Sequence, residues 1–384
     1  MTEKANNSRP SKRDNAWWNN RFYTVLISVA LIGGGCAFLI PLFITSYGPG
    51  DSIAGLRQTF LAITGGTLAI LTLWETRRKN DQEHMRQVHA ERRSRYATAI
   101  EQLADEKAPI RLGGVYTLVK LVDEWLADEK TLPNEEERQE EGQIIVNSLC
   151  AYIRSSVDLA SKAEILSQDK APENYGGGAQ QGAKSPTRSY EEQELQLTIL
   201  EAIKTRLNGG TITQEDGTKK LLKGPWSDFD YDFSNAHFFC PVGFANSYFG
   251  ASSNFSGVNF TEDAEFSGAK FAHNADFFET IFTQGANFSG SIFTQDANFS
   301  RATFFWGANF SRTTFAKNAI FSSVHCSHRA GPKGYNFEVS PDSSYKIETR
   351  EQEHNGGKFI IPKDTKLFDP HSWTILQTDK SHSA

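Results

Sequence analysis

Seventeen phenylalanines between Phe233 and Phe321 follow one another at distances of five and six residues in strict alternation. This eleven-residue period excludes an α-helix, because at ~100° per residue alternate phenylalanines would lie about 140° apart. It also excludes a flat strand, where a step of five would turn successive side chains to opposite faces. A chain that turns after each short strand, so that every phenylalanine faces one central axis, satisfies the spacing. The repeat therefore predicts a β-solenoid.

A second column of small side chains accompanies the phenylalanines. The residue two positions before each phenylalanine from Phe238 to Phe321 is Ala, Ser, Thr or Val, as in Ala236, Ala264 and Ala297. The two positions have the same parity in a strand, so both side chains face inward. One large and one small group on each face fill a narrow interior at ordinary protein density.

Every six-residue step contains one residue more than the five-residue step. In six of the eight six-residue steps this residue is Asp, Asn or Gly, types that tolerate left-handed backbone angles. We therefore expect a positive φ and an inserted turn or bulge at these positions. They are Asp263, Asn274, Gly285, Asp296, Gly307 and Asn318.

The segments "ANFSG", "AEFSG", "ADFFE" and "ANFSR" resemble the pentapeptide-repeat family, whose unit is roughly Ala-(Asp/Asn)-(Leu/Phe)-X-X. The resemblance covers Phe233 to Phe321 and implies a right-handed, four-sided β-helix over residues 226–326. The family runs in strict fives, so the sixth residue is a departure that puts the corner geometry in doubt. The upstream segment "RYATAIEQLADEKAPIRLGGVYTLVKLV" also resembles the helical region of membrane-anchored bacterial members of this family.

Four faces imply 22 residues per coil and about four coils, a rod of roughly 20 Å at ~4.8 Å per strand. Residues 22 apart then form ladders on the outside. One ladder is Asn254, Asp276 and Asn298, and the opposite face carries Glu265, Asn287 and Asn309. The coil ends need covers, because open strand edges pair with other chains. We expect the segment with Trp226 and the C-terminal region 327–384 to supply them.

Two apolar stretches near the N-terminus predict a membrane anchor over residues 22–74. Phe22 to Gly50 has no charged residue, and Gln58 to Trp74 approaches the ~20 apolar residues that a spanning helix needs. Basic residues flank both stretches, in region 1–21 and after Trp74, whereas the loop "GPGDSIAG" has none. This asymmetry places both termini in the cytoplasm. The expected location is the inner membrane of a bacterium, with the lipid bilayer as a partner.

The middle of the chain predicts helices. Region 75–161 contains a charged stalk and two amphipathic helices, and region 187–210 contains one more helix, which Gly209 and Gly210 end. Region 162–186, with "YGGGAQQGAKSP", has the composition of a linker. The stalk is either a solvated helix or a coiled coil, and association of the chain with itself through the stalk or the anchor is an open expectation.

No motif in the sequence predicts catalysis, and we expect neither a cofactor nor a metal. "HCSH" (His325, Cys326 and His328) lacks the distant second pair of a zinc site. The four cysteines are far apart and indicate free thiols. No domain is strongly basic, and the net charge of the chain is −6, so a nucleic-acid partner is not expected.

Departures from the repeat mark a candidate surface for an unidentified protein partner. Phe278, Phe305 and Trp306 stand at outward positions where other coils carry Ser, Gly or Arg. Exposed aromatic residues mark binding surfaces, but packing against the cap or the helical region explains them equally well. Together with the ladder residues the candidate surface is Phe278, Phe305, Trp306, Glu265, Asp276, Asn287, Asn298 and Asn309.

The sequence favours a non-enzymatic, membrane-anchored scaffold that presents a β-helical surface to the cytoplasm. The alternative is inhibition of a topoisomerase such as DNA gyrase by DNA mimicry, as in some proteins of the family that the chain resembles. Mimicry needs a dense negative surface, and residues 226–326 carry nine acidic and four basic side chains, a net −5.

Overall fold

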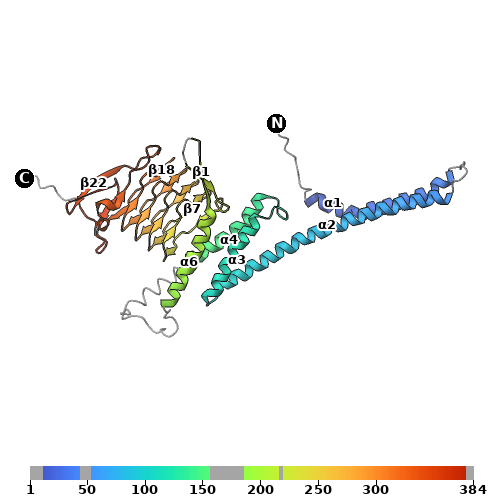
Figure 1. Cartoon of the computed structure of the whole chain (residues 1–384), viewed down its shortest axis with the longest axis horizontal. Helices are drawn as coiled ribbons and strands as arrows, with labels where there is room; N and C mark the ends of the chain where they lie inside the picture. The colour runs from blue at the N-terminus through green and yellow to red at the C-terminus, as the bar shows by residue number, and fades with distance from the viewer. Residues whose placement is uncertain (1–11, 44–52, 156–185, 216–218, 378–384) are drawn as a thin grey trace, which may run out of the picture. The chain divides into compact units, whose positions relative to one another are not determined.

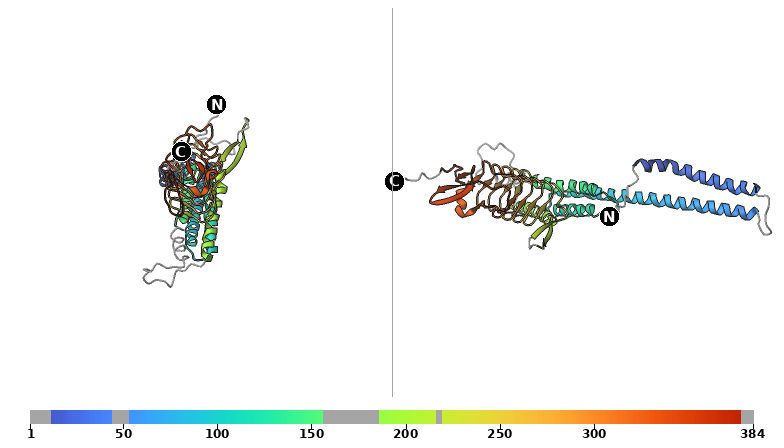
Figure 2. Two further views of the ribbon diagram at one scale, coloured as in Figure 1. Left: turned by 90° about the vertical axis from the view of Figure 1, so that its left-hand side faces the viewer. Right: turned by 90° about the horizontal axis from the view of Figure 1, so that it is seen from above.

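The computed structural model describes residues 12–43, 53–155, 186–215 and 219–377, and it divides into two compact units, Met1–Glu91 and Arg92–Ala384. The linker expected at 162–186 lies, except for Pro186, outside the described residues. The first unit contains α1 (Lys12–Phe43) and the first part of α2 (Ile53–Leu103). The two helices lie side by side (Figures 1 and 2), and a Cβ on Gly33 of α1 would clash with Thr64 of α2.

The apolar stretches of the first unit are long enough to cross a membrane. They lie in Arg21–Ile40 of α1 and in α2 from Ala54 onward, and 6% of the first apolar window and none of the second is buried. Leu31, Ile70 and Leu73 are each about seven-tenths exposed. A soluble protein buries such stretches in its core, so these side chains remain without a protein covering in the described part of the chain.

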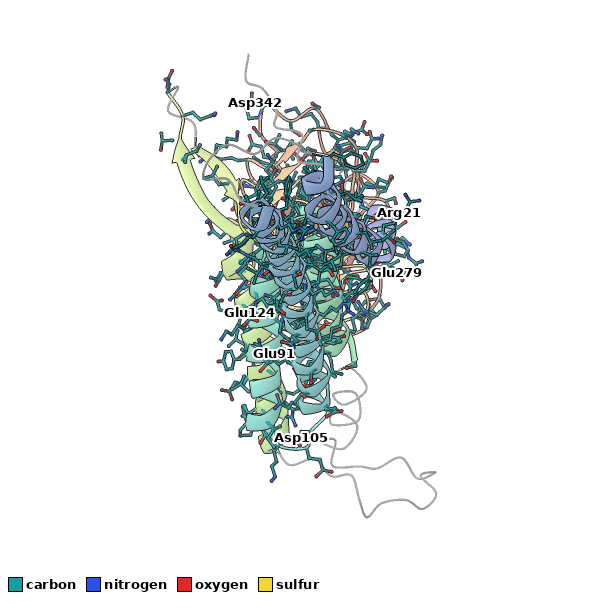
Figure 3. The ribbon with its side chains drawn as sticks, turned by 90° about the vertical axis from the view of Figure 1, so that its right-hand side faces the viewer. Arg21, Glu91, Asp105, Glu124, Glu279 and Asp342 are labelled. Atoms are coloured by element: carbon teal, nitrogen blue, oxygen red, sulfur yellow. The ribbon has the colours of Figure 1, made fainter. Side chains whose placement is uncertain are left out.

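The second unit begins with a bundle made by the end of α2, α3 (Ala108–Leu126), α4 (Glu135–Ser155) and α6 (Pro186–Leu207). The apolar stripes predicted for these helices are buried, with Leu118, Val122 and Leu149 fully enclosed. Asp105 marks the turn from α2 to α3, and Glu124 of α3 accepts hydrogen bonds from Arg95 of α2 (Figure 3). The second apolar stretch and the charged stalk that follows it form one continuous helix, α2.

Asp128, two residues after the end of α3, has a lowered pKa. Burial acts to raise the pKa of Asp128, but hydrogen bonds from Thr131 and Arg92 outweigh it and lower this pKa from 3.8 to about 2. A carboxyl whose pKa is lower in the folded state stabilises the fold above its unfolded pKa, so this contribution is lost between about pH 4 and pH 2. We expect Asp128→Asn to flatten the fall in melting temperature over this range. Equal slopes for the two proteins would contradict the assignment.

A short antiparallel hairpin of β1 (Asn208–Thr213) and β2 (Lys219–Lys223) follows α6 and projects from the unit (Figure 3). The sequence did not predict this hairpin. The helix expected over 187–210 ends at Leu207, because Gly209 and Gly210 already belong to β1. A Cβ on Gly209 would lie 2.1 Å from the backbone oxygen of Lys223, and Gly210 has a φ of +87°.

The repeat region winds into a β-solenoid of about four turns, as predicted, with four parallel sheets as its faces (Figure 1). Within residues 231–327 each strand pairs in parallel with the strand 22 residues away, as Ala275 does with Ser253 and Ala297. The first face contains β3 (Tyr231–Asp232), β7 (Ser253–Asn254), β11 (Ala275–Asp276), β15 (Ala297–Asn298) and β19 (Ala319–Ile320). The second contains β4 (His237–Phe238), β8 (Asn259–Phe260), β12 (Ile281–Phe282), β16 (Thr303–Phe304), β20 (His325–Ser327) and β24 (Lys366–Phe368). The third contains β5 (Val242–Gly243), β9 (Ala264–Glu265), β13 (Ala286–Asn287), β17 (Ala308–Asn309) and β21 (Tyr335–Asn336). The fourth contains β6 (Tyr248–Phe249), β10 (Lys270–Phe271), β14 (Ile292–Phe293) and β18 (Thr314–Phe315).

The phenylalanines fill the interior as columns of stacked rings. The ring of Phe277 lies 4.9 Å from that of Phe255 and 4.8 Å from that of Phe299, and the planes are within 4° of parallel. The small companions are also enclosed. The hydroxyls of Thr280, Ser291 and Thr313 donate to backbone carbonyls, whereas those of Ser247 and Ser253 are buried without a hydrogen-bond partner. Three of the five hydroxyls in this column therefore find a backbone acceptor between the stacked rings, and the two nearest the first coil do not.

The expectation of positive φ at the sixth residues is wrong. Of those six residues only Gly307 has a positive φ, of 129°. The left-handed residue instead stands in the five-residue step, two positions after the phenylalanine, as Gly257 and Gly268 do. There the chain makes a tight turn, closed by the amide of Val258 on the carbonyl of Phe255. The six-residue step needs no such turn, since its extra residue stays in the ladder, where the carbonyl of Asp263 accepts the amide of Val242.

Both ends of the solenoid are covered. At the first coil, α4 lies on β3 and α6 lies on β4 and β5, and Gln196 of α6 bonds to the carbonyl of His237 and the amide of Phe239. Trp226 is fully buried beside this end. At the last coil, β21 and β24 extend two faces, and the amides of Ser340 and Ser344 bond to the fourth face. A hairpin of β22 (Thr349–His354) and β23 (Gly357–Pro362) and the short helices η1 (His328–Ala330) and η2 (Pro332–Gly334) complete the C-terminal cap.

Candidate functional site

The three outward aromatic residues lie in different surroundings. Phe305 packs into the C-terminal cap, with its ring edge-on to Phe368 and Trp373, both at 5.4 Å. Packing against the cap, the alternative that the sequence left open, therefore accounts for Phe305. Phe278 is half-buried at a corner of the solenoid, beneath the guanidinium of Arg301 at 5.7 Å.

Trp306 is the most exposed of these three residues, with 43% of its surface accessible. Its ring carries the guanidinium of Arg329 at 4.5 Å, an arrangement in which the cation is attracted by the ring's quadrupole. The backbone next to Trp306 is held tightly, since a Cβ on Gly307 would lie 2.4 Å from the carbonyl oxygen of Gly334. The ring is thus fixed at a corner of the third face.

The predicted ladders exist on opposite faces, and their side chains form hydrogen bonds to the neighbouring coil and to the turn that follows. Asn254 and Asn298 of the first face donate to the carboxylates of Asp232 and Asp276 one coil before them. Each ladder oxygen also accepts the amide two residues further on, as Asp276 accepts that of Phe278 at 3.0 Å. These hydrogen bonds hold the turns, so the first-face ladder has a structural role that the sequence reasoning did not assign to it.

Four of the predicted residues come together in one place. Glu265, Asn287, Asn309 and Trp306 line a shallow groove of about 300 Å³ on the third face. We call it the Glu265 groove. The structure leaves the other predicted residues outside it: Asp276 and Asn298 lie on the first face, Phe278 at another corner and Phe305 in the cap.

The groove exists because two of the three corner residues that precede β9, β13 and β17 of the third face are glycines, which have no side chain. This column of corner residues reads Asp263, Gly285 and Gly307, whereas the matching column beside the first face reads Asn274, Asp296 and Asn318. The two glycines leave a trough between the Asn ladder and Trp306. The sequence reasoning missed Asp263 as a groove residue, although a comparison of the two columns at 22-residue spacing would have shown the difference.

Negative charge gathers at one end of the Glu265 groove. Both oxygens of Glu265 are bonded, one to the amide of Ser267 and one to the side-chain amide of Asn287. Asp263 uses one oxygen to accept the amide of Gly285 at 3.0 Å, and its side chain is exposed. A carboxylate fixed by one hydrogen bond keeps acceptor capacity for a cation. The groove can therefore accept a positively charged group beside an aromatic ring.

The thiols and histidines offer no comparable chemistry. Burial raises the pKa of Cys240 to about 11 and of Cys150 to about 12, and it raises the pKa of Cys326 further, so these thiols stay protonated at neutral pH. Cys326 of the "HCSH" segment is fully buried within the solenoid. Within the described residues, no group of three or more His, Cys, Asp or Glu side chains could hold a metal ion.

A chain that stacks each short strand on the strand one coil away, around a core of inward side chains, is a β-solenoid. Residues 277–325 match the family model described as pentapeptide repeats, with 9 copies. The chain therefore carries a domain of the pentapeptide-repeat family. No curated protein and no solved structure matches the chain.

Proposed function

We propose that this protein is a non-enzymatic scaffold, anchored in a bacterial inner membrane, whose solenoid binds a basic segment of a protein partner in the Glu265 groove on the cytoplasmic side. The observation that carries the proposal is the groove itself. It combines two carboxylates, a tryptophan and a floor without side chains, and one of the carboxylates, that of Asp263, is exposed and accepts a single hydrogen bond.

The anchor rests on the exposure of the apolar side chains of α1 and α2. Burial of a large apolar side chain is worth about 1.5–3 kcal/mol, and a membrane supplies that burial where the protein does not. Basic residues such as Arg21, Arg77 and Arg78 flank the apolar stretches, in agreement with two cytoplasmic ends.

The chemistry of the groove favours a lysine or arginine side chain. Asp263 and Glu265 attract a cation, and the ring of Trp306, which carries Arg329 on one face, borders the same groove. The side-chain NH2 of Asn309 offers a hydrogen bond to the backbone of an extended segment that lies along the third face, whereas Asn287 already donates to Glu265. A basic segment therefore matches both the charge and the polar groups of the groove.

A photo-crosslinking amino acid at Asn309, in the full chain within its native membrane, tests this proposal. We expect a discrete adduct that weakens when Asp263→Asn is added, because the asparagine oxygen still accepts the amide of Gly285 while the charge is lost. Alkaline extraction of the same membranes tests the anchor separately, since an integral protein stays in the pellet.

Asn298 provides the matched control, as the same residue type in the opposite ladder. A crosslinker at Asn298 is expected to give no adduct that depends on Asp263. Adducts of equal yield from both faces, or a yield from Asn309 that Asp263→Asn leaves unchanged, would contradict binding in the groove without bearing on the anchor.

The ladders support inhibition of DNA gyrase less well than they support binding of a protein partner. DNA presents a continuous row of charges, whereas the ladders alternate or dilute their carboxylates with amides: Asp232, Asn254, Asp276 and Asn298 on one face, and Glu265, Asn287 and Asn309 on the other. We expect the full chain in detergent to leave gyrase supercoiling unchanged. Inhibition at concentrations near that of the enzyme would revive the alternative.

A further inference from the structure

A second recess lies at the other border of the third face, where the chain turns toward the fourth face. Its volume is about 720 Å³, and it is closed on one side by the segment 338–341 of the C-terminal cap. Its polar lining consists of Ser289, Ser311, Arg312, Asn336 and Glu338. This pocket shares no lining residue with the Glu265 groove.

Arg312 occupies a backbone position that suits other residues better. Its φ is +59°, in the left-handed region that is unfavourable for a residue with a Cβ. The same corner column has Asn246, Gly268 and Gly290, which are the types that adopt this conformation readily. Glu279, Arg301 and Ser323 take the same conformation at another corner, so the repeat imposes it, and at Arg312 it places the residue in the lining of the pocket.

Arg301 is the comparable arginine, at a corner outside the pocket. It also has a φ of +59°, in the corner column between the first and second faces, and its guanidinium lies 2.6 Å from the carboxylate of Glu279. Arg312 forms no comparable ion pair with a carboxylate of the described residues. Among residues 219–377, as the structure describes them, its guanidinium has no hydrogen bond and no ion pair, and only its backbone amide bonds to Glu338.

The pocket also collects unused hydroxyl donors. Ser289 and Ser311 stand one coil apart, and their hydroxyls have no hydrogen-bond partner in the described part of the chain. A guanidinium with adjacent hydroxyl donors is the set of groups that binds carboxylate or phosphate oxygens. Glu338 is the opposing group, since its exposed carboxylate lines the same pocket and would repel an anion.

We propose that this pocket binds an oxyanion, a phosphate monoester or a carboxylate carried by a ligand, with Arg312 as the charged contact and the hydroxyls of Ser289 and Ser311 as additional donors. The site is independent of the Glu265 groove and attracts the opposite charge. The solenoid thereby offers a cation-binding and an anion-binding place at the two borders of one face.

Isothermal titration calorimetry of the full chain in a non-ionic detergent, at constant ionic strength, tests the site with inorganic phosphate and with acetate. We expect millimolar binding of at least one of the two, weakened about tenfold or more by Arg312→Gly, since charge-assisted hydrogen bonds are lost. Binding of phosphate alone indicates a phosphate monoester, and binding of acetate alone a carboxylate. We expect Glu338→Gln to strengthen binding, because it removes the repelling charge.

Arg301→Gly is the matched control, because it removes the same side chain from the same backbone conformation outside the pocket. It is expected to leave anion binding unchanged, and the melting temperature of both glycine variants should stay level or rise as the strain is relieved. Two results would overturn the proposal: no binding of either anion in the millimolar range, or an Arg312→Gly protein that binds as the wild type does.

Discussion

Replacement of Phe277 by alanine is expected to lower the free energy of unfolding of the solenoid by about 3–5 kcal/mol, the usual loss for a phenylalanine removed from a core. The ring of Phe277 is fully buried. It stacks on Phe255 and Phe299 in the coils before and after, and it meets the edges of Phe266 and Phe288 on another wall. A cavity there removes contacts from three coils at once, and these coils cannot collapse without breaking the ladder register. Chemical denaturation of the full chain in detergent, followed by circular dichroism, measures the loss.

The neighbouring residue supplies the control. Phe278 is the same residue type, one position further on, but it faces outward at a corner where the other coils have Ser256 and Ser300. Phe278→Ser should change stability by well under the loss at Phe277, about 1 kcal/mol or less, because a half-buried ring loses only its packing with Arg301. Similar losses at the two positions would mean that the inward and outward assignment of the repeat is wrong.

The sequence predicts the solenoid so well because the large inward residue on every face is a phenylalanine. A phenylalanine every five or six residues sets the parity of each strand, and the 22-residue coil follows from four walls. Register is strongly specified when one face is buried, since a slip of one residue would expose every ring. With the phenylalanines inside, the 22-residue spacing places the ladders of Asn254 and Glu265 on opposite outer faces.

The corners were harder to predict, because residue type gives an ambiguous signal there. Asp, Asn and Gly suit a left-handed turn, but they also suit an extended corner residue whose side chain accepts an amide, as Asp263 does from Gly285. The left-handed positions of the five-residue steps cannot be recognised from residue type, because these positions have different residues, such as Gly257, Glu279 and Arg301. Ladder contacts impose that conformation and override local preference.

The candidate site was predictable in part. Trp306 and the Asn ladder could be named from departures and register, but the groove itself is made by absent side chains at Gly285 and Gly307. Phe305 looked equivalent to Trp306 in sequence, yet the tail folds back and Phe368 covers it. No period links residues 305 and 368, so only the fold of the cap could separate the two neighbours.

The covers of the first coil also lie outside any period, and one glutamine there has a large expected effect. Gln196 of α6 is fully buried, and its side-chain amide acts as a strand would, donating to the carbonyl of His237 and accepting the amide of Phe239. Gln196→Leu fills the same space without polar atoms and leaves both backbone groups buried without these partners. Each stranded group costs about 1–3 kcal/mol, so we expect a total loss of about 2–5 kcal/mol.

Glu194→Leu is the comparison that isolates this effect, since Glu194 is exposed on the same helix and the substitution introduces the same side chain. It should leave the unfolding free energy within about 0.5 kcal/mol of the wild type. Hydrogen exchange adds a local readout: Gln196→Leu should speed exchange at Phe239 and in β4, the outer strand of the second face, more than in β12 two coils away. Because each coil contacts only its neighbours, loss of the cover opens the solenoid from that end. Uniformly faster exchange in all coils would instead mean that the helices and the solenoid unfold as one unit, and that Gln196 does not act as a local cover of the first strand.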